Sequence, residues 1–73
     1  MKKYISSSNI EYFYWIFPDK SKESVALYKG RTSSLTECRQ MLDYYKKHYA
    51  SSCVITIKEL GTDHWICTRA DNF

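Results

Sequence analysis

The side chains able to do chemistry in this 73-residue chain are three cysteines and two histidines: Cys38, Cys53, Cys67, His48 and His64. A catalytic thiol needs a nearby general base and a lowered pKa. His64 and Cys67 are three positions apart in an expected strand, so their side chains point to opposite faces. His48 stands at the end of an expected helix. We therefore interpret the cysteines as buried structural thiols.

No spacing typical of a metal site or a phosphate loop is present. A zinc site needs about four ligands, and the chain contains no CxxC or HxxxH pair. The two glycines, Gly30 and Gly61, are too few for a glycine-rich phosphate loop. The carboxylates are scattered, at Glu11, Glu59, Asp63 and Asp71. The sequence predicts a protein that is not an enzyme and uses no metal or cofactor.

Length and composition indicate a single small cytoplasmic domain. A chain of 73 residues buries a thin core and leaves little room for a deep cleft. An odd number of cysteines does not suggest a disulfide framework, and free thiols suit a reducing cytosol. We find no signal peptide, and no stretch approaches the roughly 20 apolar residues that span a bilayer. The net charge of +3 is mild for a dedicated nucleic-acid binder.

The predicted elements follow the order hairpin, helix, hairpin. Residues 10–17 and 24–30 are expected strands, separated by a turn-forming segment that begins at Pro18. Residues 34–49 carry apolar side chains at helical spacing, after a capping-box pattern at Ser34 and Glu37. Residues 52–60 and 63–70 are expected strands, joined by a two-residue turn at Gly61 and Thr62. Residues 1–8 are polar, and we expect them to be flexible.

These elements predict an α+β fold over residues 1–73. A right-handed crossover through the helix places the third strand beside the first. The result is a ββαββ domain with a four-stranded antiparallel sheet, in the order 2-1-3-4, and one helix packed on one face. No element remains to cover the other face of the sheet.

In the first strand, alternating side chains decide which residues reach the uncovered face. We assign Phe13, Trp15 and Phe17 to the core, because the hydroxyl groups of tyrosines stay satisfied at a partly wet surface. Tyr12 and Tyr14 then point away from the helix.

The second hairpin supplies the rest of the uncovered face. With the turn at Gly61 and Thr62, Ile57 pairs with Ile66 and Lys58 with Trp65, although a slip of one residue would reverse part of this pattern. Val54, Thr56 and Cys67 are then expected on the uncovered face. The predicted binding residues are Tyr12, Tyr14, Tyr28, Lys58, Trp65 and Arg69.

Two interpretations of these aromatic side chains stay open. They either cover a thin core from outside, as aromatic strand residues commonly do, or form a contact surface for another molecule. Under the second interpretation we expect a protein-binding module that docks its aromatic face, or an edge of its sheet, onto a protein partner. That partner is either a larger target that the module inhibits or a second copy of the chain in a homodimer.

In size and general make-up the chain resembles accessory proteins of phages and mobile elements that block host enzymes or defence complexes; no residue motif carries this resemblance. The alternative function is binding of single-stranded nucleic acid, by base stacking on Tyr12, Tyr14 and Trp65 beside Lys58 and Arg69. We rank it below protein binding because of the low net charge and the missing aromatic-and-glycine RNA signature.

Overall fold

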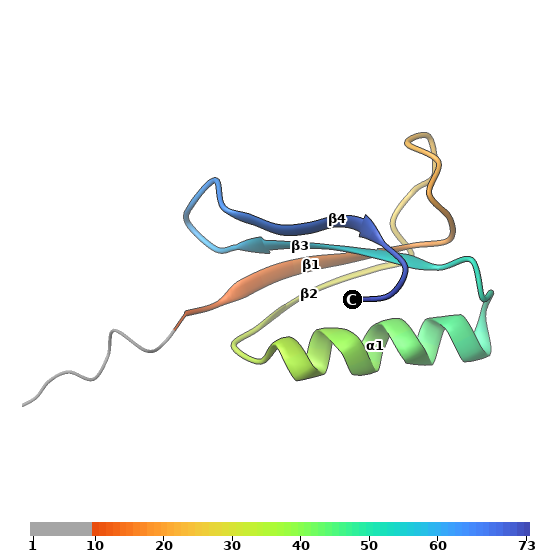
Figure 1. Ribbon diagram of the computed structural model, residues 1–73, viewed down its shortest axis with the longest axis horizontal. Helices are drawn as coiled ribbons and strands as arrows, with labels where there is room; N and C mark the ends of the chain where they lie inside the picture. Colours follow the sequence, from red (N-terminus) through yellow and green to blue (C-terminus); the bar gives the residue numbers. More distant parts are fainter. Residues whose placement is uncertain (1–9) are drawn as a thin grey trace, which may run out of the picture.

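Residues 10–73 are described by a computed structural model of the chain, so the expectation for residues 1–8 lies outside the described part. The elements are β1 (Tyr12–Phe17), β2 (Tyr28–Thr32), α1 (Leu35–His48), β3 (Val54–Glu59) and β4 (Trp65–Ala70). The strands form one antiparallel sheet in the order β2-β1-β3-β4. The helix α1 runs along one face of this sheet (Figure 1). The predicted ββαββ fold and strand order are confirmed.

The helix begins where the sequence places its cap. The Ser34 side chain accepts a hydrogen bond from the Glu37 backbone N–H, at 3.4 Å. The expected capping box is not completed, because the Ser34 N–H donates to Thr32 Oγ1 instead. The Glu37 carboxylate accepts hydrogen bonds from the hydroxyls of Thr32 and Tyr14, at 3.0 and 3.2 Å.

Within residues 10–73, no helix is both long enough and apolar enough to cross a membrane.

The strand β2 begins later than the sequence predicts. We expected residues 24–30, but β2 spans Tyr28–Thr32, and residues 18–27 form a longer connection. Gly30 therefore lies inside the strand, opposite Tyr14 of β1. A Cβ atom on Gly30 would lie 3.0 Å from Tyr14 Oη and 3.1 Å from Tyr14 Cε1. The missing side chain of Gly30 makes room for the Tyr14 ring.

The core lies between α1 and the sheet. Its buried side chains come from both layers: Tyr14, Ile16, Cys38, Leu42, Cys53, Ile55 and Ile57. The predicted facing of β1 is therefore wrong, because Tyr14 and Ile16 are fully buried beneath the helix. Tyrosine is tolerated there for two reasons: Gly30 leaves space for the ring, and Glu37 accepts the hydroxyl hydrogen bond.

The second hairpin keeps the predicted pairing of Lys58 with Trp65. Its connection is longer than the expected two-residue turn and is closed by a hydrogen bond from the Glu59 N–H to the His64 carbonyl, at 2.9 Å. Beyond Trp65 the register shifts, so that Ile57 pairs with Cys67 and not with Ile66. The extra residue brings Cys67 against the core, and its predicted place on the uncovered face is wrong.

A second shift follows along the same pair of strands. Ile55 pairs with Ala70, which leaves Thr68 and Arg69 together opposite Thr56. Arg69 has a φ of 51°, in the left-handed region, and its N–H donates to Thr56 Oγ1 at 3.0 Å. With two extra residues, the alternation is restored, so Trp65 and Arg69 lie on the same face of the sheet.

We predict that Gly30→Ala lowers the free energy of unfolding by about 1–2 kcal/mol, because the new methyl group overlaps the Tyr14 ring. Urea denaturation measures this loss. The control is Gly61→Asn, since Gly61 has a φ of 81° and an added Cβ there meets no atom within 4 Å. Asparagine tolerates this conformation, so we expect a change of about 0.5 kcal/mol or less. Wild-type stability of Gly30→Ala would show that the ring does not occupy this space.

Candidate binding site on the open sheet face

The face of the sheet opposite α1 combines aromatic rings with cations. Directly paired residues of antiparallel strands share a face. Phe13 pairs with Arg31 and Lys58, and Trp15 pairs with Lys29 and Thr56. We call this surface the open face; its side chains are Phe13, Trp15, Phe17, Lys29, Arg31, Val54, Thr56, Lys58, Trp65, Thr68 and Arg69.

The four rings of the open face are held by their neighbours. Phe13 stacks on Trp15, with ring centroids 5.0 Å apart and planes 7° from parallel. Lys58 Nζ lies 5.2 Å from the Trp65 ring centroid. Arg69 Cζ lies 3.7 Å from the centroid of Phe17. One face of each ring is therefore already in contact with a side chain of the protein itself.

These rings form a thin apolar layer with an exposed outer surface. Beneath them Val54 is fully buried and Thr56 is 7% exposed, so the rings do shield the middle of the sheet. Trp65 nevertheless remains 49% exposed. In the described chain, α1 covers only the opposite face. The aromatic layer thus covers the residues of the sheet beneath it, while its own outer surface remains partly exposed to solvent.

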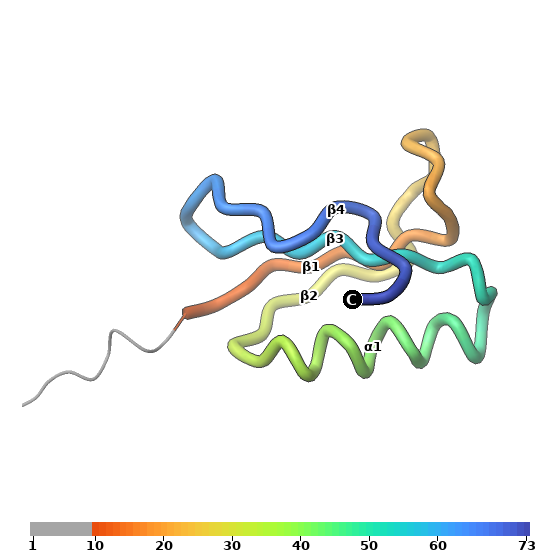
Figure 2. Tube along the Cα trace, in the orientation of Figure 1, coloured from red at the N-terminus to blue at the C-terminus, as the bar shows by residue number. Residues whose placement is uncertain are grey.

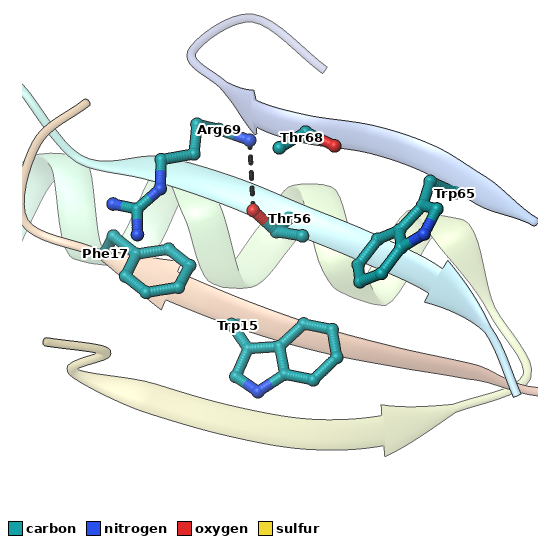
Figure 3. A pocket seen from close by; sticks show the side chains of 6 residues that line it. All are labelled: Trp15, Phe17, Thr56, Trp65, Thr68 and Arg69. Atoms are coloured by element: carbon teal, nitrogen blue, oxygen red, sulfur yellow. Dashed lines mark hydrogen bonds between the residues drawn. The ribbon is translucent and has the colours of Figure 1, made fainter. Parts of the chain in front are cut away.

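A hollow of about 280 Å³ opens within this layer, lined by Trp15, Phe17, Thr56, Trp65, Thr68 and Arg69. Figure 3 shows Trp15 on β1 and Trp65 on β4, with Thr56 on β3 between them and α1 behind the sheet. The lining is mostly apolar, with two threonine hydroxyls and one guanidinium. Such a lining suits an apolar or aromatic group of side-chain size.

Arg69 ties β4 to the connection formed by residues 18–27. Its Nη1 donates to the Ser21 carbonyl at 2.6 Å and to Ser24 Oγ at 2.9 Å. The connection stands on the side of the sheet away from α1, as the traces in Figures 1 and 2 show. Arg69 therefore holds one end of the open face in place, between Phe17 and this connection.

The structure brings only half of the predicted binding residues together. Lys58, Trp65 and Arg69 lie on the open face, as predicted. The placement of the three tyrosines is wrong. Tyr12 and Tyr14 pack in or against the core. The Tyr28 ring lies 5.9 Å from Tyr14 and 6.0 Å from Tyr45 of the helix, measured between centroids.

Phe13, Trp15 and Phe17 take the place of the tyrosines on the open face, although the sequence analysis assigned them to the core. Lys29 and Arg31 of β2 were not predicted as site residues. The sequence does contain one signal for this arrangement, because Gly30 leaves a gap on one face of a strand. Tyr14, the residue of β1 paired with Gly30, can place its large ring in that gap.

The buried Tyr14 hydroxyl has an altered proton affinity. Burial, with smaller contributions from Tyr28 and Glu37, raises the pKa of Tyr14 well above its usual value of about 10. Its hydroxyl donates to Glu37 Oε2, and this hydrogen bond requires the protonated form. The hydroxyl is therefore a structural donor in the core.

Burial also governs the thiols. It raises the pKa of Cys38 to about 11, with a further contribution from Glu37, and it raises the pKa of Cys67. Both thiols thus stay protonated at neutral pH, the less nucleophilic form. Between residues 10 and 73, no cluster of three His, Cys, Asp or Glu side chains could hold a metal ion. That the chain is not an enzyme stays a prediction.

Comparison with known proteins identifies no relative: no protein-family model, no curated protein and no solved structure matches this chain. The function has to be inferred from the open face itself.

Raising the pH above about 10 is expected to destabilise the fold through Tyr14. The raised pKa means that the folded protein holds this proton more tightly than the unfolded chain, so stability present below the unfolded pKa is lost as the pH rises. Urea denaturation from about pH 8 to about pH 11 should show a smaller loss for Tyr14→Phe than for the wild type. Tyr44→Phe, at a 53% exposed tyrosine, should behave like the wild type. Equal losses in all three proteins would contradict the prediction.

Arg69→Lys is expected to loosen the connection formed by residues 18–27. Lysine keeps the positive charge, and it is as strained as arginine by the left-handed backbone conformation at position 69. It lacks the planar guanidinium that stacks on Phe17 and donates to Ser21 and Ser24. Amide hydrogen exchange should become faster in residues 19–24, while Arg31→Lys leaves it unchanged. Unaltered exchange in Arg69→Lys would show that other contacts hold the connection.

Proposed function

We propose that this protein is a binding module that docks the open face of its sheet onto a partner protein. The observation that carries the proposal is the aromatic layer exposed to solvent, with a hollow lined by Trp15, Phe17 and Trp65. Contiguous exposed apolar patches of this kind are typical of contact surfaces. Tryptophan and arginine are also the residue types that most often dominate the energy of protein interfaces.

The hollow provides an anchor point for such docking. Interfaces gain much of their energy from a few side chains that fill desolvated pockets. Here the Phe13–Trp15 stack and the contact of Arg69 with Phe17 hold the rings before a partner binds. Because these side chains are already ordered, their immobilisation costs little on binding.

Single-stranded nucleic acid fits this face less well. Bases bind such surfaces by stacking on exposed ring faces. On the open face, Phe13 and Trp15 cover one face of each other, and Lys58 and Arg69 lie over Trp65 and Phe17. Protein side chains can contact the remaining faces and the ring edges, whereas a run of stacked bases needs an open platform.

The effect of docking that we propose is steric, since it includes no chemical step. A chain of 73 residues bound by one face covers a surface of a larger protein. In this form the module acts as an inhibitor of a host enzyme or defence complex, the role of the phage and mobile-element proteins whose make-up it resembles.

Affinity capture with the tagged chain from a nuclease-treated lysate of its own cell tests the proposal. We expect a protein to be recovered by the wild type and by Tyr44→Ala, and recovery to fall at least about tenfold with Trp65→Ala. Tyr44 is the matched control, because it is an aromatic residue of similar exposure on α1: 53%, against 49% for Trp65. Circular dichroism checks that both variants remain folded.

Three results would contradict the proposal. Recovery that is equal for Trp65→Ala and the wild type would show that the open face is not the interface. Recovery from an untreated lysate that is lost after nuclease treatment would favour the alternative function. Recovery of only a second copy of the chain would overturn the inhibitor role.

A further inference from the structure

The ionisable side chains of the open face are mostly cationic. Lys29 and Arg31 reach it from β2, and Lys58 from β3. Arg69 is the fourth cation, and the Glu11 carboxylate lies 2.7 Å from the Arg31 guanidinium. Four cations against one carboxylate give this face a formal charge of +3, equal to the net charge of the whole chain. The adjoining connection holds Lys20, Lys22, Asp19 and Glu23, and Lys20 pairs with Asp71 at 3.1 Å, so these neighbours reduce the positive charge by one.

Two of these cations are free to pair with a partner. Within residues 10–73, neither Lys29 nor Lys58 takes part in an ion pair. Lys58 lies over Trp65, and Lys29 is paired with Trp15, so they flank the two tryptophans of the hollow. A second hollow adjoins the first through Trp15 and extends to Val25 and Lys29. The two apolar hollows of the open face are thus bordered by lysines that form no ion pair within the described residues.

From this arrangement we infer that the partner presents an acidic segment with a large apolar side chain. The apolar side chain enters the hollow lined by Trp15, Phe17 and Trp65, and the flanking carboxylates of the partner pair with Lys29 and Lys58. Complementary charge of this kind orients the partner and selects against basic sequences. The inference rests on the proposed function and adds the chemistry of the partner.

Selection from a random library of peptides about 12 residues long, displayed against the immobilised full chain, tests this inference. The enriched peptides are expected to carry an aromatic residue, Leu, Ile or Met next to Asp and Glu. Their binding should change the tryptophan fluorescence of the chain. For peptides without tryptophan, that signal reports on the open face, because the chain has two tryptophans and both lie there.

Charge-reversal variants separate the two parts of the inference. Lys58→Glu is expected to weaken binding of the selected peptides by about tenfold or more. Arg39→Glu makes the same change in charge at an exposed position of α1, and should change binding by less than about twofold. Circular dichroism verifies that both variants fold.

The outcomes are distinguishable. Enriched peptides without net negative charge, or an unchanged affinity in Lys58→Glu, would overturn the acidic partner; binding that still depends on Trp65 would then leave the proposed function standing. Peptides that bind Trp65→Ala as tightly as the wild type would overturn the open face as the interface, and the proposed function with it. Tighter binding of an oligothymidylate of about 12 nucleotides than of any selected peptide would overturn both in favour of nucleic acid.

Discussion

The placement of the Tyr14 ring above Gly30 determines which side of β1 faces the core. Gly30 is the residue paired with Tyr14 in β2, and any larger side chain there meets the ring. The Tyr14 hydroxyl also binds Glu37 in the first turn of α1, so the same side chain connects the sheet to the start of the helix. Because strand residues alternate, burying Tyr14 turns Phe13 and Trp15 to the open face. One packing contact thus orients both layers.

The two faces of the sheet are packed to different degrees. Toward α1, the rings and aliphatic side chains are closed off from water, and Tyr14, Ile16 and Ile55 are fully buried. On the open face, the aromatic layer shields Val54 and Thr56, while Trp65 within the layer remains 49% exposed. A chain of this length has few residues to spare for a second covering layer. A second molecule bound to this face can bury the apolar area that the fold leaves exposed there.

The sequence was sufficient to predict the order and pairing of the elements, but not which face of β1 is buried against the helix. The helix followed from its apolar spacing and from Ser34, and the pairing of Lys58 with Trp65 followed from a connection centred on Gly61 and Thr62. In β1 the side chains on both faces of the strand are apolar or aromatic. Their alternation therefore does not indicate which face is buried. The choice depends on Gly30, a residue of another strand.

The register shifts of β4 were equally hidden from the sequence. They depend on contacts between distant segments, such as the Arg69 N–H with Thr56 and the Arg69 guanidinium with Ser21. The sequence therefore predicted the type of site, aromatic rings with cations on an uncovered face, but only some of the residues that form it. Lys58 and Trp65 were placed correctly because their pairing precedes the first shift, and Arg69 because the second shift restores the alternation that the first one interrupts.

The bulges of β4 have a consequence for self-association. β4 is one of the two edge strands of the sheet, and an edge strand with a regular backbone can template the addition of a strand from another molecule. Two irregularities within six residues disrupt such a template along β4. The other edge, β2, is only five residues long and carries Lys29 and Arg31, whose charges oppose pairing with a second β2. The sheet is thereby protected against growing sideways into a polymer, while its aromatic face stays accessible.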